Sequence, residues 1–196
     1  MMNENGEIFI QKIVSELLKE YTTFEKAIPE LEIKFDKYGR GRFHDLGIWG
    51  TTNSKKKVFV GIEAKVDESF NKKVAEVYIR KKIEELNGKS TKAPKRIEEL
   101  LKRNFKVIKP EHFDLRYQFL YSTVGTIEAN ADISILCVIV FQTDGYNEIK
   151  GKRNYMDHIQ FIDSIDSEPI DSNPEIDVHK LKIGDKSMYS IYVKKR

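Results

Sequence analysis

The segment 57–66, KVFVGIEAKV, is apolar at nearly every position until it reaches Glu63 and Lys65. A short apolar run of this kind predicts a strand buried on both faces, as in the centre of a sheet covered by helices. Side chains on a strand alternate between its faces, so Glu63 and Lys65 point the same way. Two charges on one face of a buried strand are costly unless they are paired or coordinate an ion.

The remaining patterns give the order of elements around this strand. A helical stripe of apolar residues predicts a first helix over about 6–22, which Pro29 prevents from continuing. The further expected elements are strands at 31–35 and 42–50, helices at about 72–86, 95–104 and 113–127, an apolar strand at 132–143, a helix at about 155–165, a loop at 166–175, and a hairpin at 179–195 that turns at Gly184-Asp185.

This order predicts a three-layer α/β/α sandwich with a mixed central sheet and a C-terminal β-hairpin. The length of 196 residues suits a single domain over 1–196. We expect its core at about 6–143 and a C-terminal extension at about 144–196.

The composition and hydropathy of the chain indicate its expected location in the cell. The N-terminus lacks the basic start and apolar run of a signal peptide, and no stretch approaches the roughly 20 apolar residues of a membrane span. The single cysteine, Cys137, lies in an apolar run and is expected to be a buried, inert thiol. We therefore expect a cytoplasmic protein without a membrane partner.

Charge is distributed unevenly along the chain. The segment 72–109 carries 13 Lys/Arg against 5 Glu, although the whole chain has a net charge of only +3. Such a segment is typical of a surface that meets a polyanion, and equally of a solvated helical face with Glu/Lys pairs.

Asp45 is expected to lie beside Glu63 and Lys65 if the strands at 42–50 and 57–66 form an antiparallel hairpin centred on Ser54. Facing residue numbers then sum to 108, and Asp45 faces Glu63 at a Cβ separation of about 5 Å. A divalent cation between these carboxylates would relieve their repulsion, and oxygen ligands suit Mg²⁺ or Mn²⁺. Such an ion can polarise a phosphoryl oxygen, while Lys65 orients or helps to deprotonate the attacking water.

Asp45, a gap of 17 residues and then Glu63-Ala64-Lys65 resemble the PD-(D/E)xK nuclease superfamily, which includes restriction endonucleases. The resemblance implies an αβββαβ core, dependence on Mg²⁺ and cleavage of nucleic acid. It also implies that Asp45, Glu63 and Lys65 are catalytic, and that Asp45, Glu63 and the carbonyl of Ala64 bind the metal. His44 replaces the proline of the motif and is expected to point away from Asp45 in a structural role.

Secondary candidates lie outside this motif. Glu7, on the apolar face of the first helix, is a further candidate metal ligand, and its alternative is a charge that complements the helix dipole. Lys72, Lys73, Arg116 and Gln118 are candidate nucleic-acid contacts, and an ordinary polar rim is the alternative for each.

The sequence thus predicts a metal-dependent endonuclease with nucleic acid, DNA in the first place, as its partner. The alternative is a protein that keeps the nuclease fold without catalysis and serves as a binding or interaction module. Cleavage of both strands of a duplex would favour a homodimer, although the sequence names no interface for one.

Overall fold

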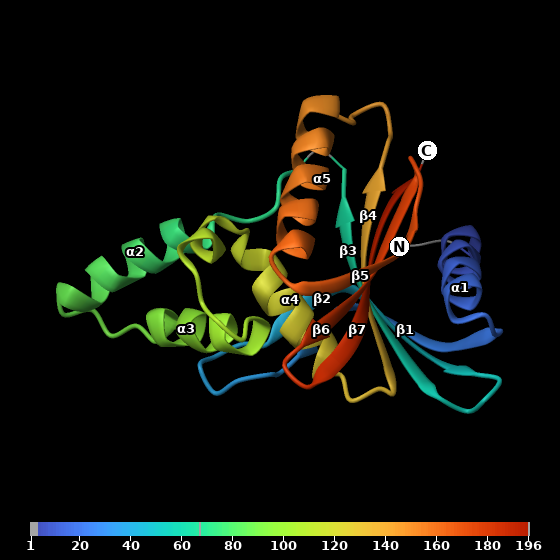
Figure 1. The fold of residues 1–196 in the computed structure, drawn as a ribbon, viewed down its shortest axis with the longest axis horizontal. Helices are drawn as coiled ribbons and strands as arrows, with labels where there is room; N and C mark the ends of the chain where they lie inside the picture. The colour runs from blue at the N-terminus through green and yellow to red at the C-terminus, as the bar shows by residue number, and fades with distance from the viewer. Residues whose placement is uncertain (1–3, 67, 196) are drawn as a thin grey trace.

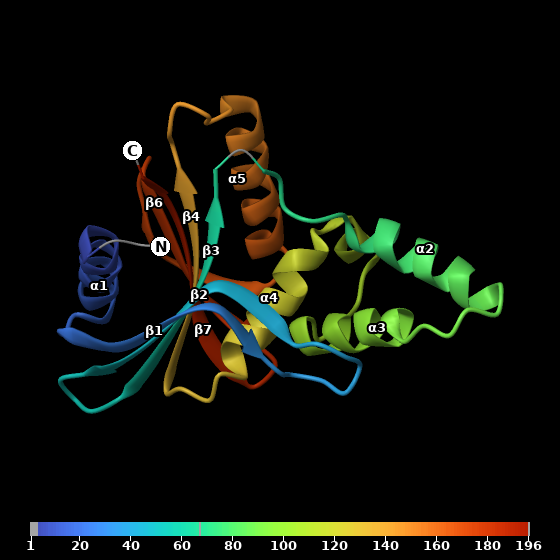
Figure 2. The same ribbon diagram turned by 180° about the vertical axis from the view of Figure 1, so that it is seen from behind.

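The computed structural model describes residues 4–66 and 68–195. A seven-stranded mixed sheet in the order β1-β2-β3-β4-β7-β6-β5 forms its centre, and helices cover both faces (Figures 1 and 2). This is the three-layer α/β/α arrangement that the sequence predicts. The elements are α1 (Glu4–Leu18), β1 (Thr22–Ile33), β2 (Arg42–Thr52), β3 (Lys57–Lys65), α2 (Val74–Leu86), α3 (Ala93–Asn104), the 3₁₀ helix η1 (Pro110–Asp114), α4 (Tyr117–Ile127), β4 (Ile133–Phe141), α5 (Glu148–Asp163), β5 (Asp166–Ser172), β6 (Ile176–Ile183) and β7 (Lys186–Lys195).

The two most apolar strands, β3 and β4, lie side by side inside the sheet. They pair in parallel, β2 pairs antiparallel with the other edge of β3, and β7 pairs in parallel with the other edge of β4. The C-terminal hairpin β6–β7, with its turn at Gly184-Asp185, therefore completes the central sheet instead of forming an appendage. Burial on both faces explains why these strands lack polar alternation.

Each face of the sheet carries its own apolar layer. On one face, α1 packs Ile10, Ile13 and Val14 into a cluster that includes Val60 and Ile62 of β3. On the other face, α4 and α5 contribute to a second cluster, and α3 joins it at the edge. The helices on this second face approach the side of β3 that carries Glu63 and Lys65.

The structure corrects the sequence prediction at both edges of the sheet. The first helix ends at Leu18, and Pro29 lies inside the long edge strand β1, where an unpaired edge tolerates a residue without an N–H donor. The segment expected as a loop at 166–175 contains β5, the opposite edge strand, whose pairing with β6 shifts register after Pro169. Polar edge strands lack the apolar alternation that strand prediction relies on.

The helices α2 and α3 form an arm that projects away from the sheet, between β3 and α4 in sequence (Figures 1 and 2). In sequence, this arm makes up most of the basic segment 72–109. Among the described residues, no helix is both long and apolar enough to cross a membrane.

Candidate active site

The hairpin of β2 and β3 has the predicted register. Leu46 pairs with Ile62 and Thr51 with Lys57, so facing residue numbers sum to 108. A turn in which the Lys55 N–H donates to the Thr52 carbonyl at 2.9 Å closes the hairpin. The ladder of paired residues ends at Leu46 and Ile62, and the candidate site lies just beyond this point.

Glu63 and Lys65 share one face of β3, as predicted, and both are only 4% exposed. The Lys65 ammonium donates to Glu63 Oε1 at 2.7 Å and lies 3.4 Å from Glu68 Oε1. Its nitrogen also lies 5.3 Å from the centre of the Phe70 ring. A single charge buried to this extent costs free energy, so Glu63 and Lys65 each depend on the other for neutralisation.

Two residues from other elements complete the environment of the Glu63 carboxylate. Arg42, the first residue of β2, donates to Glu63 Oε2, and Gln118, in the first turn of α4, donates to Oε1. The side-chain oxygen of Gln118 in turn accepts the Asn71 N–H at 3.2 Å, which ties the loop after β3 to α4. The sequence indicated Gln118 as a nucleic-acid contact, and the structure places it on the carboxylate instead.

Sequence reasoning missed Arg42 altogether. Its guanidinium is stacked 5.3 Å from the centre of the Tyr121 ring on α4. Burial lowers the pKa of Arg42 below its ordinary value, while the nearby Tyr121 and Asp45 oppose this shift. In a regular strand Arg42 would face away from Asp45, and no pattern in the sequence signals its approach to Glu63.

The carboxylate of Asp45 has different neighbours from that of Glu63. Asp45 Oδ2 accepts the N–H of Ala64 at 2.7 Å. Asp45 also lines a cavity of about 390 Å³ together with Pro29, Glu30, Leu46, Ile62, Ala64, Ile139 and Phe141. Leu46, Ile62 and Ile139 belong to the apolar layer on the α1 face. The expectation that Asp45 shares a face with Glu63 is therefore not met.

The physical reason is a break in the alternation of β2. His44 packs against Phe59, at 5.6 Å between ring centres, and so lies on the face of Glu63, where strict alternation would have placed Asp45. Leu46, two residues further, packs on the opposite face with Ile48. Across from this break, Glu30 of β1 has a φ of 50°, a left-handed backbone that non-glycine residues seldom adopt.

His44 occupies a closed slot between β3 and α4. It is fully buried, and a Cβ added to Gly61 would lie 2.6 Å from its ring. Neither ring nitrogen has a hydrogen-bond partner among the described residues. Burial, together with the charge of Arg42, lowers the pKa of His44 from 6.5 to about 3, which keeps the ring neutral. The structural role expected for His44 fits this environment.

The other sequence candidates divide between surface and interior. Lys72 is exposed, and Lys73 is half-buried with its ammonium 3.1 Å from Asp114. Arg116 is 7% exposed, and its guanidinium donates to Asp157 at 2.8 Å, so it is already committed to an ion pair inside the protein. The side chain of Glu7 lies outside the described part of the chain.

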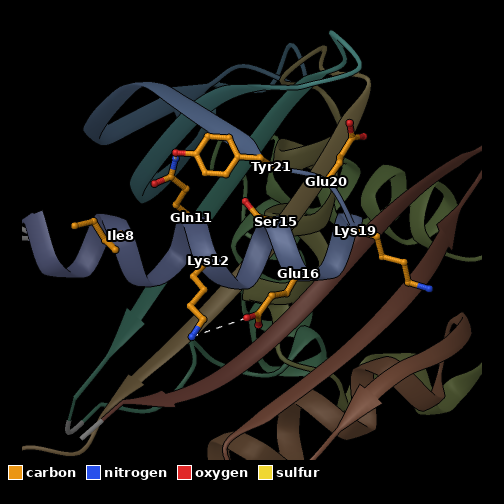
Figure 3. A pocket seen from close by; sticks show the side chains of 8 residues that line it. All are labelled: Ile8, Gln11, Lys12, Ser15, Glu16, Lys19, Glu20 and Tyr21. Atoms are coloured by element: carbon orange, nitrogen blue, oxygen red, sulfur yellow. Dashed lines mark hydrogen bonds and ion pairs between the residues drawn. The ribbon is translucent and has the colours of Figure 1, made fainter.

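A surface pocket of about 640 Å³ lies along α1, on the outer side of the α1 layer (Figure 3). Gln11 bridges to Tyr21 Oη at 3.2 Å, and Lys12 and Glu16 form an exposed ion pair at 3.9 Å. Its walls are Ile8, Tyr21 and polar side chains of α1 and of the turn that follows it. None of the residues around Glu63 lines this pocket, so the buried charges at the end of β3 are the stronger candidate site.

Comparisons with known proteins add a family but no activity. One family model matches residues 2–196, and its description is a domain of unknown function (DUF6946). No curated protein matches the chain, and no solved structure matches it.

Proposed function

The chain belongs to the DUF6946 family, a domain of unknown function, and we therefore propose an activity from the site alone. The proposed activity is Mg²⁺- or Mn²⁺-dependent hydrolysis of phosphodiester bonds by an endonuclease. DNA is the proposed substrate, and the cytoplasm is the proposed location.

One observation carries this proposal. Glu63, Lys65, Arg42 and Gln118 converge at the carboxyl end of β3, next to Asp45 and beyond the last paired residues of β2 and β3. Buried charges cost free energy, and a cluster of them at the end of a parallel strand is typical of a catalytic or binding position. The order α1, β1–β3, α4, β4 supports the same proposal, because it agrees with the αβββαβ core of the superfamily that the motif resembles.

The oxygen donors of the site suit a hard divalent cation. Asp45 lies against the backbone of Ala64, whose N–H and C=O point to the same side of the extended strand. The described residues contain no group of three His, Cys, Asp or Glu side chains placed to hold a metal. An ion held by Asp45, Glu63 and the carbonyl of Ala64 would therefore require the two carboxylates to turn toward each other, and Mg²⁺ there would supply Lewis-acid polarisation of a phosphoryl oxygen. Because Arg42 donates to Glu63 Oε2, that oxygen becomes a ligand only when Arg42 moves away.

The side chains of the site have separate tasks in this proposal. Lys65 lies beside Glu63 and orients the attacking water, while it also offsets negative charge that develops on the phosphate. Gln118 fixes the Glu63 carboxylate through a hydrogen bond. Arg42, once it leaves Glu63, offers a planar fork of donors that matches a phosphate group.

The test is cleavage of linear, circular and single-stranded DNA and of RNA with Mg²⁺, comparing wild type with Lys65→Ala. We expect the variant to lose about a hundredfold or more in rate, the typical contribution of a positioned proton-transfer group. Lys12→Ala is the matched control, because Lys12 is exposed on α1 with 75% of its side chain accessible. Equal cutting by Lys65→Ala and wild type would assign the activity to a contaminant.

A second candidate function is nucleic-acid binding without catalysis. It is favoured by the observation that Arg42 and Lys65 already balance the charge of Glu63. The buried carboxylate is then neutralised without a metal ion. A binding module would shift DNA in a gel equally well with EDTA and with Mg²⁺, and would not cut it.

Calorimetric titration with Mn²⁺ separates the two candidates without relying on activity. The nuclease proposal expects Arg42→Gln, which frees Glu63 Oε2, to bind Mn²⁺ more tightly than wild type does. Glu63→Gln removes a ligand charge and should abolish that gain. Absence of Mn²⁺ binding in wild type and in Arg42→Gln would favour the binding module.

A further inference from the structure

The outer face of α2 carries a stripe of large apolar side chains that the fold leaves uncovered. Ile79, Ile83 and Leu86 follow one another at helical spacing and are 57%, 52% and 77% exposed. The opposite face of the same helix packs inward, where Val77 and Tyr78 contact the core and Tyr78 donates to Glu98 of α3 at 2.8 Å. The stripe is therefore the outer surface of a folded, anchored helix.

The position of α2 makes this stripe accessible to another molecule. The α2–α3 arm projects from the body of the protein, away from the sheet (Figure 1). Exposed apolar side chains gathered on one face are typical of an interaction surface, whereas single ones are ordinary. The stripe extends over Ile79 to Leu86, about 10 Å along the helix axis, which suits a helix from a partner.

The charges of α2 indicate which partner fits. Arg80, Lys81 and Lys82 precede Ile83, and Glu84 and Glu85 follow it. The midpoint between Ile79 and Leu86 lies at the same place, between residues 82 and 83, where the charge of the helix changes sign. A second α2 packed antiparallel about this midpoint places Ile79 opposite Leu86 and the basic half opposite the acidic half.

We propose that the stripe Ile79, Ile83 and Leu86 is a homodimer interface, at which α2 of one copy packs antiparallel on α2 of a second copy. A parallel arrangement would place basic halves together and acidic halves together, which is repulsive. Antiparallel packing also aligns the two helix dipoles favourably. The pairs Lys81–Glu84 at 2.8 Å and Lys82–Glu85 at 2.6 Å hold these charges on the helix surface in each copy. The dimer stands independently of the proposed nuclease activity.

Sedimentation velocity over a wide range of protein concentration tests the dimer. We expect wild type to associate reversibly and Ile83→Glu to weaken association by about a hundredfold or more, because each dimer then buries two unpaired charges. Ile149→Glu is the matched control, since Ile149 is equally apolar and 82% exposed but lies on α5. A monomer at every concentration, or a dimer that Ile83→Glu leaves intact, would overturn the proposal.

Charge reversal tests the antiparallel orientation. Arg80→Glu alone and Glu84→Arg alone should each weaken self-association about tenfold, because each brings like charges together across the axis. A mixture of the two variants should recover association, since each half then meets its opposite charge. Circular dichroism of each variant checks that α2 remains folded. Failure of the mixture to associate more tightly than either variant would rule out this pairing.

Discussion

The buried His158 makes the fold sensitive to acid, and the size of the effect can be worked out. His158, on α5, is fully buried, and its Nε2 lies 3.1 Å from Ser190 Oγ on β7. Burial, with a smaller contribution from His179, lowers the pKa of His158 from 6.5 to about 3. Between these values the unfolded chain binds a proton that the folded protein does not, so stability falls as the pH falls from 6.5 toward 3.

At pH 5 this difference in proton binding costs the folded state about 2 kcal/mol relative to pH 8. The figure depends mainly on the unfolded-state pKa of 6.5, because the folded-state pKa of about 3 lies well below pH 5. His158→Gln removes the titration and keeps an amide near Ser190. We therefore expect the variant to lose about 2 kcal/mol less than wild type between pH 8 and pH 5.

Guanidinium unfolding at both pH values measures this difference. The single tryptophan, Trp49, reports unfolding through its fluorescence, since its ring lies 4.8 Å from that of Phe59 in the folded protein. His179 and Asp177, which lie near His158 on β6, are the same in wild type and variant, so the comparison isolates the change at His158. Equal losses of unfolding free energy in the two proteins would refute the reasoning.

Three further predictions concern the site and the core. Arg42→Ala removes one of the cations that pair with the buried Glu63. We expect urea unfolding at neutral pH to show a free energy of unfolding about 3 kcal/mol lower than in wild type, and a loss below about 1 kcal/mol would contradict the buried pair. Gly61→Ala drives a methyl group into His44 and should lower the free energy of unfolding by about 1–3 kcal/mol. Adding His44→Ala should reduce this loss, whereas strictly additive losses would argue against the contact. Burial raises the pKa of Cys137 to about 12, so its thiol should react with a thiol reagent at pH 8 only in denaturant, and rapid labelling of the folded protein would show an accessible thiol.

The central part of the fold could be predicted because its residues carry strong local signals. The apolar runs of β3 and β4 indicate strands buried on both faces, and the symmetric loop between β2 and β3 gives the observed register. The common face of Glu63 and Lys65 follows from strand periodicity alone. The polar edge strand β5 carries no such signal, because an edge strand that is exposed on both faces has no apolar periodicity.

The detailed arrangement of the candidate site depends on features that sequence patterns do not encode. A change of face between His44 and Leu46 turns Arg42 toward Glu63 and leaves Asp45 beside Ala64. That change coincides with one left-handed residue in the neighbouring strand, and regular alternation cannot anticipate it. Glu63 is neutralised in part by Arg42, a cation of the protein itself that no sequence pattern indicates, and not only by a metal as the motif implies.

The place of β7 in the sheet has a consequence for how the protein is made. The strand that closes the edge of β4 is β7, Lys186–Lys195, and α5, β5 and β6 separate the two strands in the chain. While a ribosome still holds this segment in its exit tunnel, the emerged part of the chain presents the apolar strand β4 with one unpaired edge. This pairing therefore forms late in folding, and until β7 has emerged and paired, the nascent protein is open to aggregation and to chaperones.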